Sequence, residues 1–274
     1  MQHLPPRRIA AIHDFSCVGR CALTVVIPTL SVMGYQTIPL PTALLSSHTG
    51  GFEGLYFRDL TADMHHISAH FDRLSMTFGS IYTGFLGSEE QISMVREFIK
   101  RFGSTPDETG KAPLILIDPV MGDDGVLYAT YTQALADGMR ELSTHAEVLT
   151  PNLTEACFLT DTPYLDTATL TEGEVEEYVL SLLEKLSHIC RGKIVVTGIS
   201  LSGGIVANAG RDSDGRRRNH RGAVGKRRNR QRRPGCKERK NLLLHAENAR
   251  RRLLRHGRYL CIGPFGSFDA RRRF

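Results

Sequence analysis

The residues best suited to chemistry in this 274-residue chain are polar groups that follow short apolar stretches. One set, in the N-terminal third, combines a carboxylate with hydroxyl, imidazole and phenol groups: Asp14, Ser16, His48, Thr49 and Tyr82. A second set follows the later stretches and is mainly acidic: Asp118, Asp123, Asn152, Glu155 and Thr197. Mg²⁺ prefers oxygen ligands and keeps several waters. The second set therefore predicts a Mg²⁺–nucleotide site.

Each of these residues also has a purely structural interpretation. Asp14 can cap a turn, and Asp118 precedes a proline and can form one. Asn152 or Thr154 can cap a following helix, and Glu155 suits the first turn of that helix. For a single residue, the two interpretations have similar weight. The argument for a site is that the polar groups come at five or six successive strand ends.

The elements that must position these groups alternate along the first 200 residues. Short apolar stretches predict strands over residues 8–15, 36–45, 80–87, 113–120, 147–152 and 193–200. Helical spacing and start or stop signals predict helices over residues 21–33, 59–74, 89–103, 131–146 and 173–189, and another from residue 154. Alternation of this kind predicts βαβ units, a mostly parallel sheet and a three-layer α/β fold. In such sheets the carboxyl ends of the strands meet at one crevice, so the two polar sets should converge.

Two strands carry more specific expectations. The stretch PLILIDPV, residues 113–120, is continuously apolar, which is typical of a parallel strand buried on both faces. The stretch QTIPLPTALL, residues 36–45, contains prolines that favour an edge position or the ends of a strand.

Several other kinds of site are excluded or disfavoured. The chain has no Walker A sequence and no GxGxxG after its first strand. Its six cysteines show no zinc spacing, which favours reduced thiols in a cytoplasmic protein. His65, His66 and His70 lack a metal-protease pattern and suit an exposed helix face. The N-terminal stretch is neither a signal peptide nor a membrane span, so no membrane partner is expected.

Several separate motifs, in order, make residues 8–205 resemble the pyridoxal kinases of the ribokinase-like superfamily. They are the long stretch from IHDFSCVGR to SSHTGGF, then TGFLGS, IDPVMGDDGVLY and TPNLTEA. The resemblance implies transfer of the ATP γ-phosphate to the 5′-hydroxymethyl group of pyridoxal, pyridoxine or pyridoxamine. Hydroxymethylpyrimidine kinases share the fold and are an alternative, although their first strand typically leads into a Ser-Gly-Gly-rich loop where this chain has HDFSCVGR.

The resemblance also implies roles for individual residues. Asp14 and Thr49 would contact the pyridine substrate, with Ser16, His48 and Tyr82 nearby. Asp118 and Glu155 would hold Mg²⁺. The ATP site would consist of Asp118, Asp123, Tyr128, Asn152, Glu155 and Thr197. The resemblance further implies a homodimer.

The C-terminal tail differs sharply from the rest of the chain. Residues 211–274 hold 22 Lys and Arg against five Asp and Glu, a net charge of +17, whereas residues 1–210 hold 13 against 24, a net charge of −11. The segment GKRRNRQRRPGCKERK, residues 225–240, contains nine basic residues. Charge of this kind usually indicates an interaction tail, so a non-specific nucleic-acid binder is a competing hypothesis. The tail lacks interleaved aromatic residues and zinc ligands, so no specific nucleic-acid partner is expected.

The tail also lacks a motif on which such kinases depend. Their C-terminal GTGD segment begins a helix whose backbone amides bind the transferring phosphoryl group, and its Asp is the general base. Residues 206–274 contain no GTGD, so no catalytic base is assigned in this chain.

A shifted reading frame explains both the basic tail and the missing motif. With permitted codons, residues 256–273 read one base later give TGDIFASVLLGALTRGDA, and residues 253–255 give YYG. Residues 241–249 give TYFYTQKMP in the same way. We therefore predict a kinase domain over residues 1–208 and an out-of-frame, disordered tail over residues 209–274, with the shift between about Asp212 and Gly225. Without its C-terminal helices, one face of the sheet should be partly bare.

Overall fold

The computed structural model describes residues 6–49, 52, 54–201, 205–212 and 245–246. The predicted disorder of the tail concerns residues that, apart from 209–212 and 245–246, lie outside this range.

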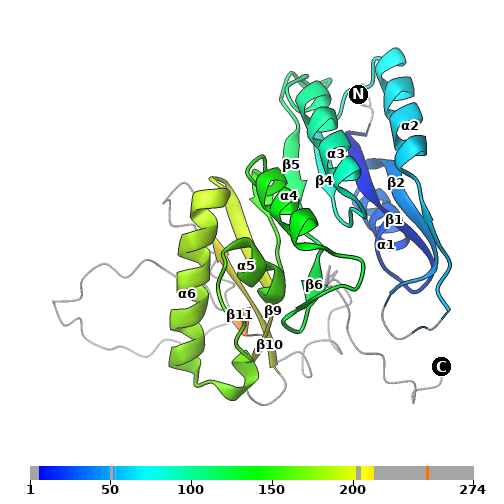
Figure 1. Cartoon of the computed structure of the whole chain (residues 1–274). Helices are drawn as coiled ribbons and strands as arrows, with labels where there is room; N and C mark the ends of the chain where they lie inside the picture. The colour runs from blue at the N-terminus through cyan, green and yellow to red at the C-terminus, as the bar shows by residue number, and fades with distance from the viewer. Residues whose placement is uncertain (1–5, 50–51, 53, 202–204, 213–244, 247–274) are drawn as a thin grey trace.

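A mostly parallel sheet of nine strands forms the centre of the described part of the chain (Figure 1). Its order is β11-β10-β9-β8-β5-β4-β1-β2-β3. The strands are β1 (Arg8–Val18), β2 (Gln36–Ser47), β3 (Phe57–Asp59), β4 (Ser80–Thr83), β5 (Leu114–Ile117), β8 (Val148–Leu149), β9 (Lys193–Leu201), β10 (Ile205–Arg211) and β11 (His245–Ala246). The six central strands, β9, β8, β5, β4, β1 and β2, pair in parallel with one another. Strand β3 pairs antiparallel with β2, β10 with β9, and β11 with β10.

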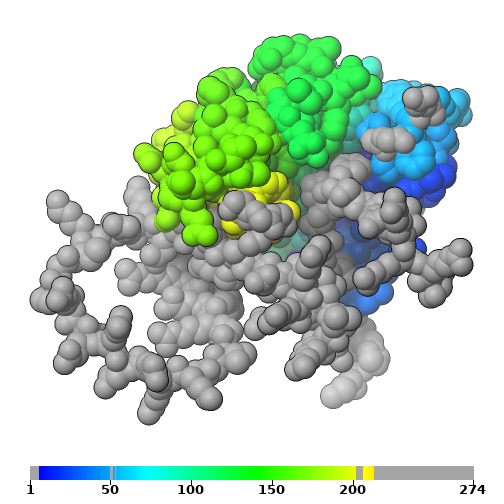
Figure 2. All heavy atoms as spheres, turned by 90° about the horizontal axis from the view of Figure 1, so that it is seen from below, coloured from blue at the N-terminus to red at the C-terminus, as the bar shows by residue number. Residues whose placement is uncertain are grey.

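Helices cover the two faces of the sheet unequally. They are α1 (Leu23–Val32), α2 (Thr61–Arg73), α3 (Glu89–Phe102), α4 (Gln133–Ser143), α5 (Leu153–Leu159) and α6 (Glu172–Ile189), with a 3₁₀ turn η1 (Thr167–Thr169). Helices α2 to α6 pack on one face around the main core, while α1 packs on the other in a smaller cluster (Figure 1). The predicted three-layer α/β fold is confirmed. Figure 2 shows the same succession from a view turned by 90°, from the N-terminal strands on one side to α6 on the other.

Local sequence signals account for the helix boundaries. Ser88, Thr132 and Thr171 each accept a hydrogen bond from the backbone three residues on, which caps α3, α4 and α6. The predicted stop of the first helix at Gly34 is confirmed, because this residue has a φ of +88° directly after the cap of α1.

The prolines of β2 lie where the strand has a single neighbour. Strand β3 pairs only with residues Ala43–Leu45, so Pro39 and Pro41 face a partner on the β1 side alone. The prediction of an edge position is therefore correct for the first half of β2, and wrong for the second half, which β3 covers. A proline lacks the N–H that a second neighbour would need.

The prediction that the strand at 113–120 is buried on both faces is wrong. Ile115 and Ile117 of β5 pack against the core beneath the helices, so Leu114 and Leu116 point to the opposite face. Leu114 is 45% exposed there, and Leu116 is only half-buried. Val206 of β10 is 61% exposed on the same face, because its neighbour Ala207 lies in the core. The described residues thus leave an apolar part of this face uncovered, as the sequence predicts.

Strand β10 continues to Arg211, three residues beyond the predicted domain boundary at 208. Arg211 also pairs with Glu184 of α6 through a 2.9 Å contact, so the strand is anchored to the described domain.

Candidate functional site

The first polar group gathers where β1, β2 and β4 end. Asp14 is 8% exposed, and its Oδ2 accepts a hydrogen bond of 2.8 Å from the Ser16 hydroxyl. Burial raises the pKa of Asp14, and the bond from Ser16 opposes that effect. A β-bulge between His13 and Phe15 shifts the register of β1 against β2 at this point. The extra residue lies on β2, while Asp14 and Ser16 are two residues apart on β1, so strand alternation places both on one face.

His48 forms part of the same end of the sheet. Its backbone N–H donates to the Val18 carbonyl at 3.0 Å, which joins the ends of β1 and β2. A Cβ on Gly19 would lie 2.2 Å from the His48 ring, so a glycine with a φ of +102° lets the ring approach. Phe52 contacts the ring edge-on at 4.9 Å between centroids. Thr49 is exposed at the end of β2, next to this ring.

The second polar group centres on two carboxylates at the ends of β5 and β8, of which Glu155 is buried and Asp118 half-buried. Asp118 follows β5, and burial raises its pKa to about 7, opposed by a hydrogen bond from Thr150. Glu155, which is 3% exposed, has a pKa raised well above its usual value by burial and then by the charge of Asp118. Neither carboxylate has an ion-pair partner among the described residues.

Asn152 and Glu155 form a capping box at the start of α5. The Asn152 side chain accepts from the Glu155 N–H at 2.8 Å, and the Glu155 carboxylate accepts from the Asn152 N–H at 2.7 Å. The structural interpretation of both residues is therefore correct. Glu155 also accepts from the Met121 N–H at 3.3 Å, and Asn152 donates to the Gly122 carbonyl at 2.8 Å. The same two side chains thus hold the loop after β5 against the helix.

Three further predicted residues lie around these carboxylates. Asp123 is in β6 (Gly122–Asp123), which forms a hairpin with β7 (Val126–Leu127). Burial raises the pKa of Tyr128, and the charges of Glu155, Asp123 and Asp118 raise it further. Thr197 of β9 bridges to Asn152, and its N–H donates to the Pro151 carbonyl at 2.9 Å.

Tyr82 links the two groups. It lies on β4, between β1 with Asp14 and β5 with Asp118. Burial raises the pKa of its phenol, and the charge of Asp118 is the second cause. The strands that carry the predicted residues are therefore neighbours in the sheet, from β2 through β1, β4, β5 and β8 to β9, and their carboxyl ends lie along one edge.

The structure adds three residues to the predicted set. Thr150 bonds Asp118, His13 contacts Tyr82, and the phenol of Tyr131 is buried near Glu155. The strand-end argument could have found Thr150, because it directly follows β8. His13 is one of the polar groups at the end of β1 and falls under the same argument, whereas Tyr131 carries no motif that would distinguish it from a core residue.

The donor set fits a magnesium ion in two respects. Asp118 and Glu155 supply hard oxygen ligands, and two desolvated carboxylates without an ion-pair partner in the described part of the chain favour a cation. Among the described residues, no group of three or more His, Cys, Asp or Glu side chains could hold a metal ion. Most ligands of the Mg²⁺ would therefore be waters or phosphate oxygens.

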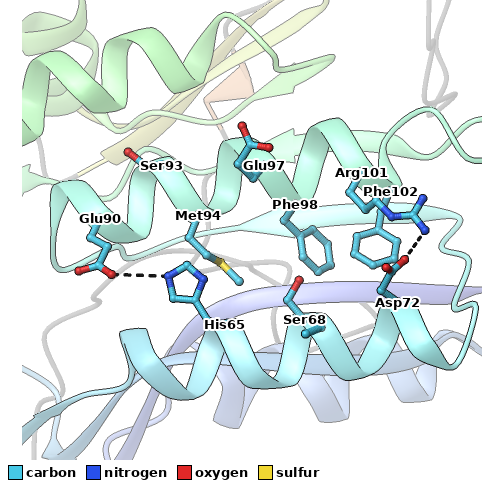
Figure 3. A pocket seen from close by; sticks show the side chains of 11 residues that line it. His65, Ser68, Asp72, Glu90, Ser93, Met94, Glu97, Phe98, Arg101 and Phe102 are labelled. Carbon is cyan, nitrogen blue, oxygen red and sulfur yellow. Dashed lines mark hydrogen bonds and ion pairs between the residues drawn. The ribbon is translucent and has the colours of Figure 1, made fainter.

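A groove elsewhere on the molecule contains none of the predicted residues. It has a volume of about 490 Å³ and lies between α2 and α3, with Met94, Phe98 and Phe102 at its base (Figure 3). Ion pairs from His65 to Glu90 and from Asp72 to Arg101 span its two ends.

None of the described helices has the length and apolar content needed to span a bilayer.

Comparison with known sequences gives a family match over most of the chain. The profile described as phosphomethylpyrimidine kinase matches residues 22–214. The pyridoxine/pyridoxal/pyridoxamine kinase of Bordetella avium is 32% identical over 161 residues, which cover 56% of this chain and 51% of that protein. The pyridoxal kinase of Arabidopsis thaliana is 31% identical, with 56% and 48% covered. The chain therefore spans about half the length of the curated relatives that it matches.

Solved structures give the same result. A candidate phosphomethylpyrimidine kinase from Bacteroides thetaiotaomicron, crystallised with pyridoxal, is 42% identical with a TM-score of 0.66. The similarity covers 77% of this chain and 70% of that one. The pyridoxal kinase of Lactobacillus plantarum is 28% identical with a TM-score of 0.63, over 74% and 68% of the two chains.

Proposed function

The chain belongs to the phosphomethylpyrimidine kinase family, and from that premise we propose that its domain is an ATP-dependent kinase for the 5′-hydroxymethyl group of pyridoxal, pyridoxine or pyridoxamine. The observation that carries the proposal is the row of polar residues along one sheet edge, with Asp14 at one end and the Asp118–Glu155 pair at the other. This order, with an alcohol-binding group next to a phosphate-binding group, suits a small alcohol beside a nucleotide. Support also comes from the 42% identical relative, which was crystallised with pyridoxal.

Each group has a defined task in this proposal. Asp14, Ser16, His48, Thr49 and Tyr82 would bind and orient the pyridine ring. Asp118 and Glu155 would hold Mg²⁺, which neutralises charge on the phosphates as the γ-phosphoryl group is transferred. Asn152, Asp123, Tyr128 and Thr197 would border the nucleotide.

We further propose that this polypeptide is impaired, because residues 206–274 lack the GTGD segment. Loss of a single oxyanion-type donor alone costs roughly 10²–10³ in rate, and here the general base is lost as well. The exposed apolar residues Leu114 and Val206 support this proposal, since they mark a sheet face without its cover in the described part. We propose that the kinase domain covers residues 1–208 and continues through β10 to Arg211, and that the remainder of residues 209–274 is an out-of-frame tail.

Sequencing of the coding DNA for residues 210–274 tests the frameshift. We expect the bases one frame over to encode GTGD near residues 256–258. The hypothesis is refuted if they do not.

Restoring the frame tests the activity. We expect the restored protein to phosphorylate pyridoxal with ATP and Mg²⁺, and the chain as printed to show no significant turnover in the same coupled assay. Normal turnover of the printed chain would contradict the proposed impairment, and an inactive restored protein would contradict the proposed reaction.

Hydroxymethylpyrimidine is the second candidate substrate, favoured by the family match. Comparing kcat/KM for pyridoxal and hydroxymethylpyrimidine on the restored protein separates the two. The homodimer and the cytoplasmic location stay predictions.

A further inference from the structure

His13 precedes Asp14 on β1 and has no task in the function proposed above. Its side chain is 4% exposed, and its Nε2 is buried with no hydrogen-bond partner within the described part of the chain. Buried polar atoms normally have a partner, so an unpaired one needs an explanation. Burial lowers the pKa of His13 to about 3, so the ring is neutral at physiological pH.

Gly84 leaves the space that the His13 ring occupies. A Cβ at this position would lie 2.1 Å from Nδ1 and 2.6 Å from Cε1 of His13. Gly84 is not among the positive-φ glycines, so it is required here for space and not for its backbone conformation. Its N–H donates to the Ile12 carbonyl at 2.9 Å, which fixes it against β1.

The His13 ring contacts Tyr82 edge-on. The ring centroids are 4.3 Å apart, and the planes meet at 78°. This geometry is favourable for aromatic pairs and restricts the tilt of both rings. Tyr82 lies between Asp14 and Asp118, so its orientation sets the boundary between the two polar groups.

We propose that His13 is a positioning residue. Seated against Gly84, its ring fixes the Tyr82 ring as the wall against which an aromatic substrate heterocycle packs, where the substrate pocket meets the nucleotide site. The importance of this wall rests on the proposed kinase function. The contact between the His13 and Tyr82 rings is observed independently of that function.

The test uses the full chain labelled with fluorotyrosine, since the sequence holds eight tyrosines and Tyr82→Phe identifies the signal of interest. We expect His13→Ala to shift the Tyr82 fluorine signal toward that of free fluorotyrosine. His13→Phe restores an edge-on ring without ring nitrogens, so it should restore the signal. Pyridoxal titration should show binding weakened about five- to tenfold by His13→Ala and largely recovered by His13→Phe.

Gly84→Ala provides a second measurement, because its methyl group displaces the His13 ring. We expect it to shift the Tyr82 signal and lower the melting temperature, and His13→Ala in the same chain to recover part of that temperature. Gly79→Ala is the matched control, since its methyl group meets only the flexible end of Arg7, at 2.8 Å. It should leave the Tyr82 signal unchanged.

The proposal is overturned if the Tyr82 signal is the same in His13→Ala as in the parent chain, or if His13→Phe fails to restore it. If Gly84→Ala does not fold, the two His13 variants decide. A third outcome is that the fluorine shifts follow the expectation but neither the parent chain nor any variant binds pyridoxal. In that case the positioning role stands, and the proposed substrate is wrong for this chain.

Discussion

At the scale of residues, the Asp118–Glu155 pair is the strongest chemical feature of the site. Glu155 is buried and Asp118 half-buried, desolvation raises the pKa of both, and the charge of Asp118 raises that of Glu155 further. Such a pair destabilises a domain unless a proton or a cation neutralises it. The direction of both pKa shifts therefore leads to a test that needs no catalytic activity.

We predict that the unfolding free energy falls as pH rises from about 4 to about 7. In this range the folded chain keeps a proton on Asp118, whose pKa is about 7, while the unfolded chain has lost it. Urea unfolding at pH 5 and pH 8 measures the fall. Asp118→Asn should reduce it and leave the part that the burial of Glu155 contributes, and Mg²⁺ at pH 8 should offset it in the parent chain.

Asp107 is a control of opposite sign. Hydrogen bonds from Thr109, and then from Arg7, lower its pKa, so it stabilises the chain at neutral pH and loses that effect in acid. Asp107→Asn should destabilise the chain at pH 8 and leave the decline between pH 5 and 8 in place. An Asp118→Asn variant with the same decline as the parent would contradict the assignment.

At the scale of elements, the types of helix and strand follow from the sequence better than their pairing does. Apolar spacing identifies every helix from α1 to α6 and the strands β1, β2, β4, β5, β8 and β9. It misses β3, which has three exposed residues and no apolar pattern. It also misses β10, where two alanines and one glycine leave too few large apolar residues to show the alternation.

The hairpin β6–β7 could have been predicted. Asp124 and Gly125 have φ of +48° and +81°, the left-handed pair that a tight Asp-Gly hairpin turn requires. The sequence interpretation treated this segment only as a source of carboxylates. The unpaired Nε2 of His13 could not be predicted, because it depends on how Gly84 and Tyr82 come together in space.

Two capping boxes separate a structural role from a site role. We predict that Asn152→Ala and Thr171→Ala each reduce the unfolding free energy by about 1 kcal/mol, with Asn152→Ala costing more because the Gly122 carbonyl also loses its donor. Only Asn152→Ala should weaken Mg²⁺–ATP binding, by about tenfold or more. Urea unfolding and calorimetric titration measure the two effects. Equal nucleotide affinity in both variants would show that Asn152 serves α5 alone.

At the scale of the whole molecule, the two faces of the sheet differ in how they are covered. Helices α2 to α6 bury one face, and among the described elements only α1 packs on the other. The sequence predicted a partly bare face, because the C-terminal helices that follow the GTGD segment in such kinases are missing from this chain. The sequence could not indicate which strands would be left exposed, because that depends on the sheet order.

We predict that Leu114→Lys has opposite consequences in the two forms of the protein. In the printed chain Leu114 is 45% exposed, so the change should alter the unfolding free energy by less than about 0.5 kcal/mol and reduce self-association. In the frame-restored protein the same lysine would be buried, at a cost of about 2 kcal/mol or more.

Leu74→Lys is the matched control, since Leu74 is 56% exposed at the end of α2, on the covered side of the sheet. It should be nearly neutral in both proteins. Urea unfolding and light scattering measure the two effects. An equal effect of Leu114→Lys in both proteins would show that the restored segment does not cover this face.

The strand order has a consequence for synthesis. Strand β1 sits between β2 and β4, and β5, β8, β9 and β10 then follow one another outward in the order of the chain. During translation each of these later strands emerges beside an edge that is already complete. A gene that loses its frame after β10 therefore does not disturb the pairing of anything made earlier. Under the proposed frameshift, the ribosome would release a body that still folds, and the loss would show in turnover and in the uncovered sheet face.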